Sequence, residues 1–194
     1  LDSLEKSPSD EAEQILRKNI SLLPFPVAQV HQNGSITALE MSPDGTAFLT
    51  ASSDGNTCVR NLKDGKELFC ASSSKSVHDA IFIQGGKSIA IANDAGQVQI
   101  LNAQDGSVVR EIEAGSSVQD LDVGPNGNDL AIARANGNIT ILNIANLKDK
   151  GYNIQIGGTL TAADLSPNGR WYAAGSSTGT VTVWNLNSTT IYSA

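Results

Sequence analysis

The chain has 194 residues, of which 40% are hydrophobic and 17% charged, and its formal net charge is −7 at pH 7. This length and composition suit one folded domain with a substantial core and exclude an intrinsically disordered chain. The acidic balance argues against a nucleic-acid or anionic-membrane surface, and no apolar run reaches the roughly 18–20 residues of a membrane span.

The first 24 residues have the character of a short helix. Acidic residues follow Pro8, apolar residues recur over 15–20, and the prolines of "LPFP" at 23–26 discourage continuation. We expect residues 1–24 to form a linker helix that leads into a sheet, and a partner-binding amphipathic helix is the alternative.

Residues 25–35 come next and include "VAQVH" at 27–31. This stretch has the pattern of an outermost strand, but the rest of its blade is not present in the sequence before it. We therefore expect an orphan outer strand at this place.

Four copies of one unit fill the rest of the chain. Two series of turn glycines share one register, with intervals of 41, 41 and 42 residues in each series. The glycines are Gly45, Gly86, Gly127 and Gly169 in the first series and Gly55, Gly96, Gly137 and Gly179 in the second. Because two independent series coincide, we predict a structural repeat. The predicted copies are 36–76, 77–117, 118–159 and 160–194.

Each copy has the pattern of short antiparallel strands joined by tight turns. The first strand alternates, and Pro-Asp-Gly or Pro-Asn-Gly follows it in three copies. Asp54-Gly55 and Asn136-Gly137 are strong hairpin signals between the second and third strands. The third strand is apolar on both faces in copies two to four, so it should be covered on both faces. The predicted fourth strands are "ELFCAS", "VVREIEA", "YNIQIG" and "TTIYSA".

Four short strands in each repeat of about 40 residues are typical of β-propeller blades. The units resemble WD-repeats, most clearly "MSPDGTAFLTASSDGNTCVRNLKDGKELF" in copy one and "LSPNGRWYAAGSSTGTVTVWNLN" in copy four. Copies two and three also resemble bacterial surface propellers of the YVTN type. The resemblance implies an all-β fold over residues 25–194, with four consecutive four-stranded blades of about 41 residues and a short N-terminal helix.

The copies depart from the WD pattern in a regular way. The residue after the third-strand Trp position is asparagine in every copy, at Asn61, Asn102, Asn143 and Asn185. In the WD-repeat family a histidine, a Ser/Thr, a turn aspartate and this Trp often form a buried network. Here only Trp184 fills the Trp position and only Asp54 the turn position. We expect apolar packing and turn chemistry to hold the blades, with each asparagine side chain bonding a strand-end turn.

Four blades and an orphan strand do not determine how many blades the closed propeller contains. The chain opens on Leu1 and its single methionine is Met41, so we expect it to be part of a longer parent chain. Closure with a second copy and an unusually small closed ring are the alternatives. Self-association is favoured next, because an open end exposes strand edges and an apolar blade face.

The residues that could carry chemistry have simpler interpretations. Cys58 and Cys70 are interpreted as half-buried strand thiols, although they flank the Asp64-Gly65 turn and a cross-strand bond is conceivable. First-strand acids could face a central channel and hold a cation, but polar residues lining a wet channel are the commoner explanation. These acids are Glu40, Asp79, Asp120, Asp122 and Asp164. The sequence contains no nucleophile elbow, phosphate loop or zinc-protease motif, so we expect no enzyme, no cofactor and no metal site.

We expect a non-catalytic protein-interaction or assembly platform that is part of a larger propeller or self-associates. Its partners would be other proteins or a second copy, with no nucleic acid and no membrane insertion. The candidate contact residues are Arg60, Trp171, Tyr172 and Trp184, because aromatic residues and arginine often anchor interfaces. For Trp184, packing between blades is favoured over a contact role, and one of Trp171 and Tyr172 should lie near the surface because the pair follows a turn.

Two other functions stay open. An extracytoplasmic structural or surface-layer propeller is favoured by the 13 Lys+Arg and 18 Gly residues and by the copies that resemble YVTN propellers. A propeller enzyme of the lactonase kind would need a metal or an acid–base cluster. The sequence favours a cytoplasmic location over an extracytoplasmic one.

Overall fold

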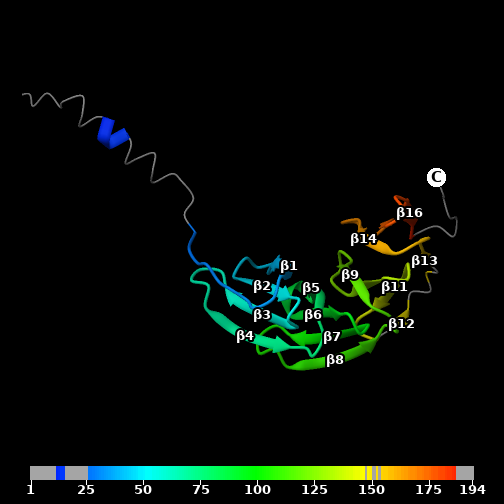
Figure 1. Cartoon of the computed structure of the whole chain (residues 1–194), viewed down its shortest axis with the longest axis horizontal. Helices are drawn as coiled ribbons and strands as arrows, with labels where there is room; N and C mark the ends of the chain where they lie inside the picture. Colours follow the sequence, from blue (N-terminus) through cyan, green and yellow to red (C-terminus); the bar gives the residue numbers. More distant parts are fainter. Residues whose placement is uncertain (1–11, 16–25, 147, 150–151, 153, 187–194) are drawn as a thin grey trace, which may run out of the picture.

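A computed structural model describes residues 12–15, 26–146, 148–149, 152 and 154–186. Four antiparallel sheets follow one another along an arc (Figure 1). The first strand of each sheet lies on the concave side of the arc, and β4 and β8 lie on the convex side. The predicted all-β fold of consecutive propeller blades is confirmed. Among the helices of the described residues, none is long and apolar enough to cross a membrane.

Blades 1 and 2 are complete meanders in which each strand pairs with the next along the chain. Blade 1 consists of β1 (Ile36–Met41), β2 (Ala47–Ser52), β3 (Asn56–Asn61) and β4 (Glu67–Ser72). Blade 2 consists of β5 (Val77–Ile83), β6 (Ser88–Asn93), β7 (Gln97–Asn102) and β8 (Val108–Glu113), with a 3-10 turn, η1 (Gln84–Gly86), after β5. This order places the first strand innermost and the fourth outermost.

The outer strand of blade 3 differs from the prediction. The inner strands are β9 (Val118–Val123), β10 (Asp129–Arg134) and β11 (Asn138–Asn143). Two short pieces, β12 (Lys148–Asp149) and β13 (Ile154–Gln155), share the outer edge of β11 in place of one strand over 152–157. Asp149 pairs with Leu142 and Ile154 pairs with Ile139. From Asp149 to Ile154 the outer chain advances five positions, whereas β11 advances three between their partners Ile139 and Leu142. The two additional residues interrupt the ladder.

Blade 4 contains β14 (Leu160–Leu165), β15 (Trp171–Ser176) and β16 (Val181–Asn185). Its predicted fourth strand, at 189–194, lies outside the described residues. At the other end of the chain, residues 12–15 are helical, and the remainder of the helix predicted over 1–24 also lies outside them.

The orphan strand expected at 27–31 is not formed, although the segment occupies the position of an outer strand. A Cβ added to Gly65 would lie 2.5 Å from the Ala28 Cβ, and one added to Gly106 would lie 2.4 Å from Phe69 Cδ2. Each pair is offset from the other by 41 residues. The segment therefore crosses blade 1 where β4 crosses blade 2. It has no ladder because no described strand lies beside it to exchange hydrogen bonds.

The hydrophobic core is divided among the three junctions between consecutive blades. One buried cluster joins blades 1 and 2, a second joins blades 2 and 3, and a third joins blades 3 and 4. The third strand of blade 2 is buried on both faces, with Val98, Ile100 and Leu101 all nearly inaccessible. The prediction that the third strand is covered from both sides is confirmed in blade 2, but it is wrong for blade 4, where Val181 and Val183 remain exposed. Each fully buried aliphatic side chain of this kind stabilises the fold by about 1.5–3 kcal/mol.

The asparagine that ends the third strand of blades 1, 2 and 3 bonds the following turn, as the sequence predicts. The side-chain oxygens accept backbone hydrogen bonds two residues on: Asn61 from Lys63 at 2.8 Å, Asn102 from Gln104 at 2.8 Å and Asn143 from Ala145 at 3.2 Å. The amide oxygen thus replaces the carboxylate of the WD pattern without adding charge.

Cys58 and Cys70 form a disulfide, so the interpretation as half-buried thiols is wrong. The two residues are direct partners in the β3–β4 ladder, with a Cα–Cα distance of 4.1 Å. Such a separation brings the two sulfur atoms within bonding reach. The bond ties the outer strand of blade 1 to its neighbour.

We expect reduction of this disulfide to lower the free energy of unfolding by about 2 kcal/mol, because it releases a loop of 12 residues in the unfolded chain. The urea midpoint with and without a dithiol reductant measures the loss. The matched control is the double variant Cys58→Ala/Cys70→Ala, whose midpoint should not respond to reductant. Equal midpoints for the oxidised and reduced wild-type protein would refute the prediction.

Candidate interaction surfaces and the inner-strand carboxylates

A carboxylate on the first strand of one blade accepts a backbone hydrogen bond from the first strand of the next blade at all three junctions. Glu40 accepts from Phe82 N–H between blades 1 and 2. Asp79 accepts from Leu121 N–H at 2.8 Å between blades 2 and 3. Asp120 accepts from Ala163 N–H at 2.9 Å, and Asp122 accepts from Leu165 N–H, between blades 3 and 4. These acids, which were candidates for a cation site, therefore link one blade to the next.

The same acids are close enough to one another to resist ionisation. Burial, followed by the charges of Asp79 and Asp122, raises the pKa of Glu40 to about 6. Burial, followed by the charge of Asp79, raises the pKa of Asp120 to about 7. Burial also raises the pKa of Asp79 and of Asp122. Burial and three of these acids raise the pKa of the Tyr172 hydroxyl as well.

The described residues offer little to a metal ion. Among them, Cys58, Glu67 and Cys70 are the group whose potential ligand atoms converge within 4.8 Å, and the disulfide occupies both sulfur atoms. The inner-strand acids do not converge in this way. Their described partners include backbone amides, which is a structural use of a carboxylate, and Asp79 also bonds Asp120 as Asp122 bonds Asp164.

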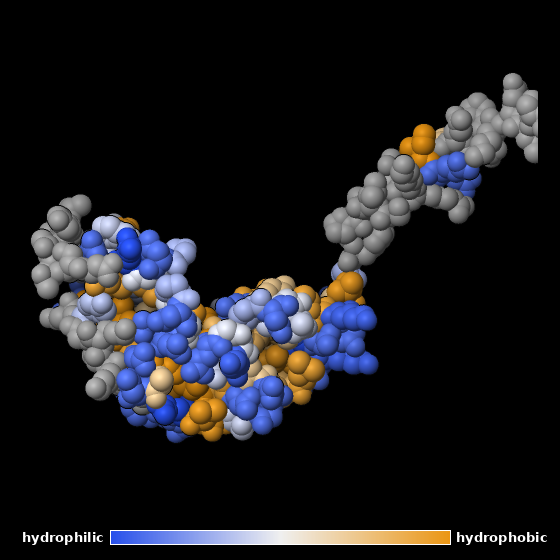
Figure 2. Space-filling view, turned by 180° about the vertical axis from the view of Figure 1, so that it is seen from behind, coloured by the Kyte–Doolittle hydropathy of each residue, from blue (hydrophilic) through white to orange (hydrophobic). Residues whose placement is uncertain are grey.

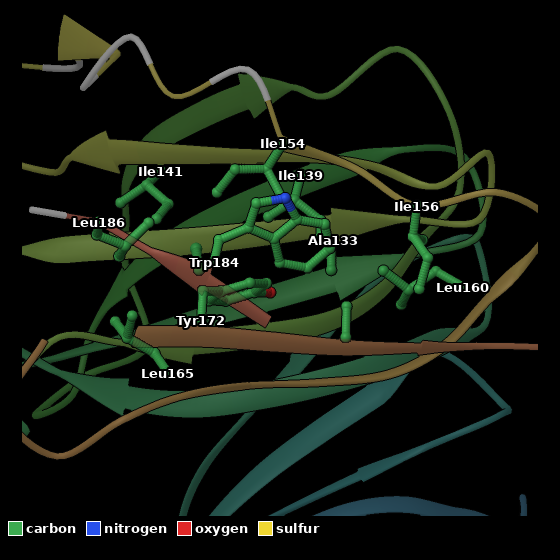
Figure 3. Close-up of a cluster of buried hydrophobic side chains, with 12 residues drawn as sticks. Ala133, Ile139, Ile141, Ile154, Ile156, Leu160, Leu165, Tyr172, Trp184 and Leu186 are labelled. Atoms are coloured by element: carbon green, nitrogen blue, oxygen red, sulfur yellow. The ribbon is translucent and has the colours of Figure 1, made fainter. Parts of the chain in front are cut away.

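Three of the four predicted contact residues lie inside the protein. Tyr172 and Trp184 pack together in the junction between blades 3 and 4, with ring centroids 6.4 Å apart and planes at 44° (Figure 3). Trp184 thus takes the interblade position that the sequence favours for it. Arg60 is buried too, so the expectation of surface contacts is wrong for Arg60 and Tyr172. Trp171 is 43% exposed.

Arg60 is buried because it replaces an apolar residue of the repeat. Its Nη1 donates to Thr50 Oγ1 at 2.9 Å, and its Nη2 lies 3.4 Å from Glu67 Oε2. The positions equivalent to Thr50 and Arg60 in blade 2 are Ile91 and Leu101, both buried. A polar pair therefore takes the place of an apolar contact.

We expect the double variant Thr50→Ile/Arg60→Leu to be as stable as the wild type or about 1 kcal/mol more stable, because an apolar pair avoids the desolvation of a buried guanidinium. Thr50→Val alone should cost about 1 kcal/mol, since it removes the acceptor of a buried donor. Urea titrations of both variants measure these changes. A double variant that is less stable than Thr50→Val would contradict the prediction.

A groove of about 740 Å³ lies at the junction of blades 1 and 2, with Val59, Phe82 and Ala103 among its lining residues. Ala103 follows the asparagine of the third strand, where blades 3 and 4 have the buried Ile144 and Leu186. The small side chain leaves space that the larger ones fill at their own junctions.

The first blade presents an apolar face that no blade covers. Ile36, Leu39 and Met41 of β1 are 52%, 63% and 53% exposed. Their equivalents in blade 2, Val77, Ala80 and Phe82, are 0%, 1% and 4% exposed because blade 1 covers them. We call the side chains of Ile36, Leu39 and Met41 the leading face.

The fourth blade presents the opposite kind of face. Trp171, Val181 and Val183 are 43%, 67% and 45% exposed, whereas Ile139 and Ile141, which are equivalent to the two valines in blade 3, are 3% and 2% exposed. We call the side chains of Trp171, Val181 and Val183, together with Asp164, the trailing face. The space-filling view shows the hollow between the two ends of the arc that carry these faces (Figure 2).

The sequence contains the signal for these faces, although only Trp171 was singled out from it. The repeat register shows which positions point towards the preceding blade and which towards the following blade. Apolar residues at those positions in the first and last copies must remain uncovered unless something else packs on them.

Comparison with protein families gives two matches within the chain. Residues 25–61 and 154–185 match the family described as WD domain, G-beta repeat. The first match covers the segment before blade 1 and most of blade 1, and the second covers β13 to β16. A search of curated proteins finds no significant match.

Proposed function

We propose that this chain, built from WD-type β-propeller blades, is a non-catalytic interaction or assembly platform that binds other proteins or a second copy of itself. The observation that carries the proposal is the pair of uncovered apolar faces at the two ends of the arc. Clusters of exposed aliphatic and aromatic side chains on a rigid scaffold are typical of protein-binding surfaces. Propellers with WD repeats are commonly used for protein interaction, which supports the same role.

The engagement of the titratable groups supports a role without catalysis. In the described part of the chain, the inner-strand acids bind backbone amides, and His78 is paired with Asp94. Asp44, Asp54 and Asp105 accept hydrogen bonds within their own turns. Side chains bonded in this way stabilise strands and turns. To act as a catalytic acid or base, such a side chain would first have to break these hydrogen bonds.

Site-specific photo-crosslinking in the source cells tests the proposal. A crosslinking side chain placed at Trp171 should capture a discrete polypeptide, because the trailing face is a binding surface. The matched control is the same side chain at Val109, which is also exposed but lies on the outer strand β8. Equal capture at the two positions, or capture at neither, would refute the platform proposal.

A second candidate function, an extracytoplasmic structural propeller, is favoured by the disulfide. Disulfides persist in oxidising compartments and are rare in a reducing cytosol. The disulfide therefore supports an extracytoplasmic location over the cytoplasmic one that the sequence favours. Alkylation of intact cells tests this candidate, because Cys58 and Cys70 should resist a thiol reagent until a reductant is added.

A further inference from the structure

We infer that the trailing face of one copy of this chain binds the leading face of a second copy, so that two four-bladed arcs close into one eight-bladed ring. This inference rests on the proposed role as a binding platform and names the partner of its end faces. The new contact repeats the junctions that already join consecutive blades within the chain.

The exposed side chains on the two faces are the two halves of one such junction. Between blades 1 and 2, Val59 of β3 and Phe82 of β5 belong to the same buried cluster. The equivalent positions at the ends of the arc are Val183 on the trailing face and Met41 on the leading face. Docking of blade 4 on a second blade 1 would bring these two residues together. This contact would bury the leading face of one copy and the trailing face of the other in the same way as the junctions within one copy are buried.

A polar contact is also prepared at both ends. Asp164 occupies the position of Glu40 and Asp122, which accept from the N–H groups of Phe82 and Leu165 in the following blade. Asp164 lies on the exposed side of β14, where no following blade is described. The N–H group equivalent to those of Phe82 and Leu165 in a following blade is that of Met41. The bond expected across the new junction runs from Met41 N–H to the Asp164 carboxylate.

The segment before blade 1 fits the same arrangement. Ala28 lies on Gly65 as Phe69 of β4 lies on Gly106, so residues 27–31 occupy the place of the fourth strand of a preceding blade. In the ring, that preceding blade is blade 4 of the other copy. The outer edge of β16 (Val181–Asn185) pairs with no described strand. Residues 27–31 of the second copy would lie on the outer side of the new junction, as β4 does at the junction of blades 1 and 2.

Two copies are sufficient to cover every end face. Each copy contributes four blades, and eight blades lie within the range of four to eight found in propellers. A head-to-tail contact either closes into a ring or propagates into a filament. Two copies close when each arc spans half of the ring, and the mass in solution distinguishes this closed pair from a filament.

Light scattering at several protein concentrations tests the inference. The wild-type chain should have a mass of about twice 20.2 kDa. Val183→Asp should abolish the dimer, because it places a charge in the apolar junction. The matched control Val109→Asp, at a valine of β8 that is 61% exposed against 45% for Val183, should remain dimeric. Circular dichroism should show both variants folded, since both residues are exposed within one copy.

A mixing experiment identifies the two surfaces as partners. Met41→Lys alone should also be monomeric. An equimolar mixture of Val183→Asp and Met41→Lys should recover the dimeric mass, because one junction then holds an Asp–Lys pair and the other is wild type.

Three outcomes would overturn the inference. They are a wild-type chain that stays monomeric at every concentration, a mass that grows without limit, and a mixture that stays monomeric. A monomeric wild type whose Trp171 crosslinks to a different polypeptide would overturn the closed pair and leave the platform proposal standing. A dimer with no foreign crosslink would support the closed pair.

Discussion

Lowering the pH from 8 to 5.5 is expected to stabilise this protein by roughly 2 kcal/mol and to raise its melting temperature by roughly 4–8 °C. The cause is the row of inner-strand acids, whose pKa values are raised in the folded state to about 6 for Glu40 and about 7 for Asp120. Because these groups are partly exposed, solvent screening reduces the energy that the pKa values alone would imply.

The sign follows from the direction of the pKa changes. A carboxyl group whose pKa is higher in the folded protein than in the unfolded chain binds protons more tightly when folded. Its contribution is complete below the unfolded pKa, which is 4.5 for Glu40 and 3.8 for Asp120, and is lost as the pH rises through the folded pKa. Stability should therefore fall steadily between about pH 5 and pH 8. Asp79, Asp122 and Asp164 face the same groups and add to the repulsion when they are ionised.

A different set of acids opposes this trend in strong acid. Hydrogen bonds from Ser42, Ser52 and Ser107 are the main causes that lower the pKa of Asp44, Asp54 and Asp105, respectively. The stability that these turn aspartates contribute is present above their ordinary pKa and is lost as the pH falls through the lowered one. We therefore expect the maximum of stability between about pH 4 and pH 5.5.

Asp120→Asn is the variant that isolates the effect. The asparagine oxygen can still accept from Ala163 N–H, but it carries no charge. The dependence of the melting temperature on pH should become shallower, and the variant should be more stable than the wild type at pH 8. Glu111→Gln on the outer strand β8 is the control and should leave the slope unchanged. A wild-type melting temperature that rises from pH 5.5 to pH 8 would exclude the mechanism.

The repeat and its strands could be predicted because local rules determine them. Positive-φ glycines mark the turns, and alternation marks the strands between them; Gly45, Gly96 and Gly137 all have the left-handed backbone that was inferred from the sequence. The strand-end asparagines were also predictable, because their bonds reach only two residues along the chain.

The contacts between blades were harder to predict, because they join residues more than 40 positions apart. The residues around Asp79 in the sequence do not show whether its carboxylate binds Leu121 N–H or faces water. Arg60 was expected at the surface because charge usually lies there, and its burial depends on Thr50 from the neighbouring strand. The interrupted outer strand of blade 3 depends on two extra residues whose place no turn signal marks.

Gly55→Ala is expected to lower the free energy of unfolding by about 4 kcal/mol. Gly55 has φ of +89°, which costs any other residue about 1 kcal/mol or more. An added Cβ would also lie 2.2 Å from the carbonyl oxygen of Ser73 and 2.9 Å from that of Lys75. These are backbone atoms of the segment between β4 and β5, and Ser73 N–H donates to the Gly55 carbonyl at 2.8 Å. The methyl group cannot be accommodated without breaking this bond, so strain and lost bonding add together.

Gly45→Ala separates the two causes. Gly45 has φ of +68°, but nothing lies within 4 Å of the Cβ it would gain, so this variant should lose only about 1 kcal/mol. Urea unfolding of both variants measures the difference, and equal losses would show that the close approach at Gly55 carries no energy. The positions equivalent to Gly55 meet the same obstacle: a Cβ would lie 2.6 Å from Ser116 O at Gly96 and 2.3 Å from Ile156 O at Gly137. Alanine at either of them should therefore cost as much as at Gly55. In blades 1 to 3 the second glycine series thus marks where the segment after the outer strand crosses the turn between the second and third strands of its own blade, and this close crossing requires glycine at the same point of these three copies.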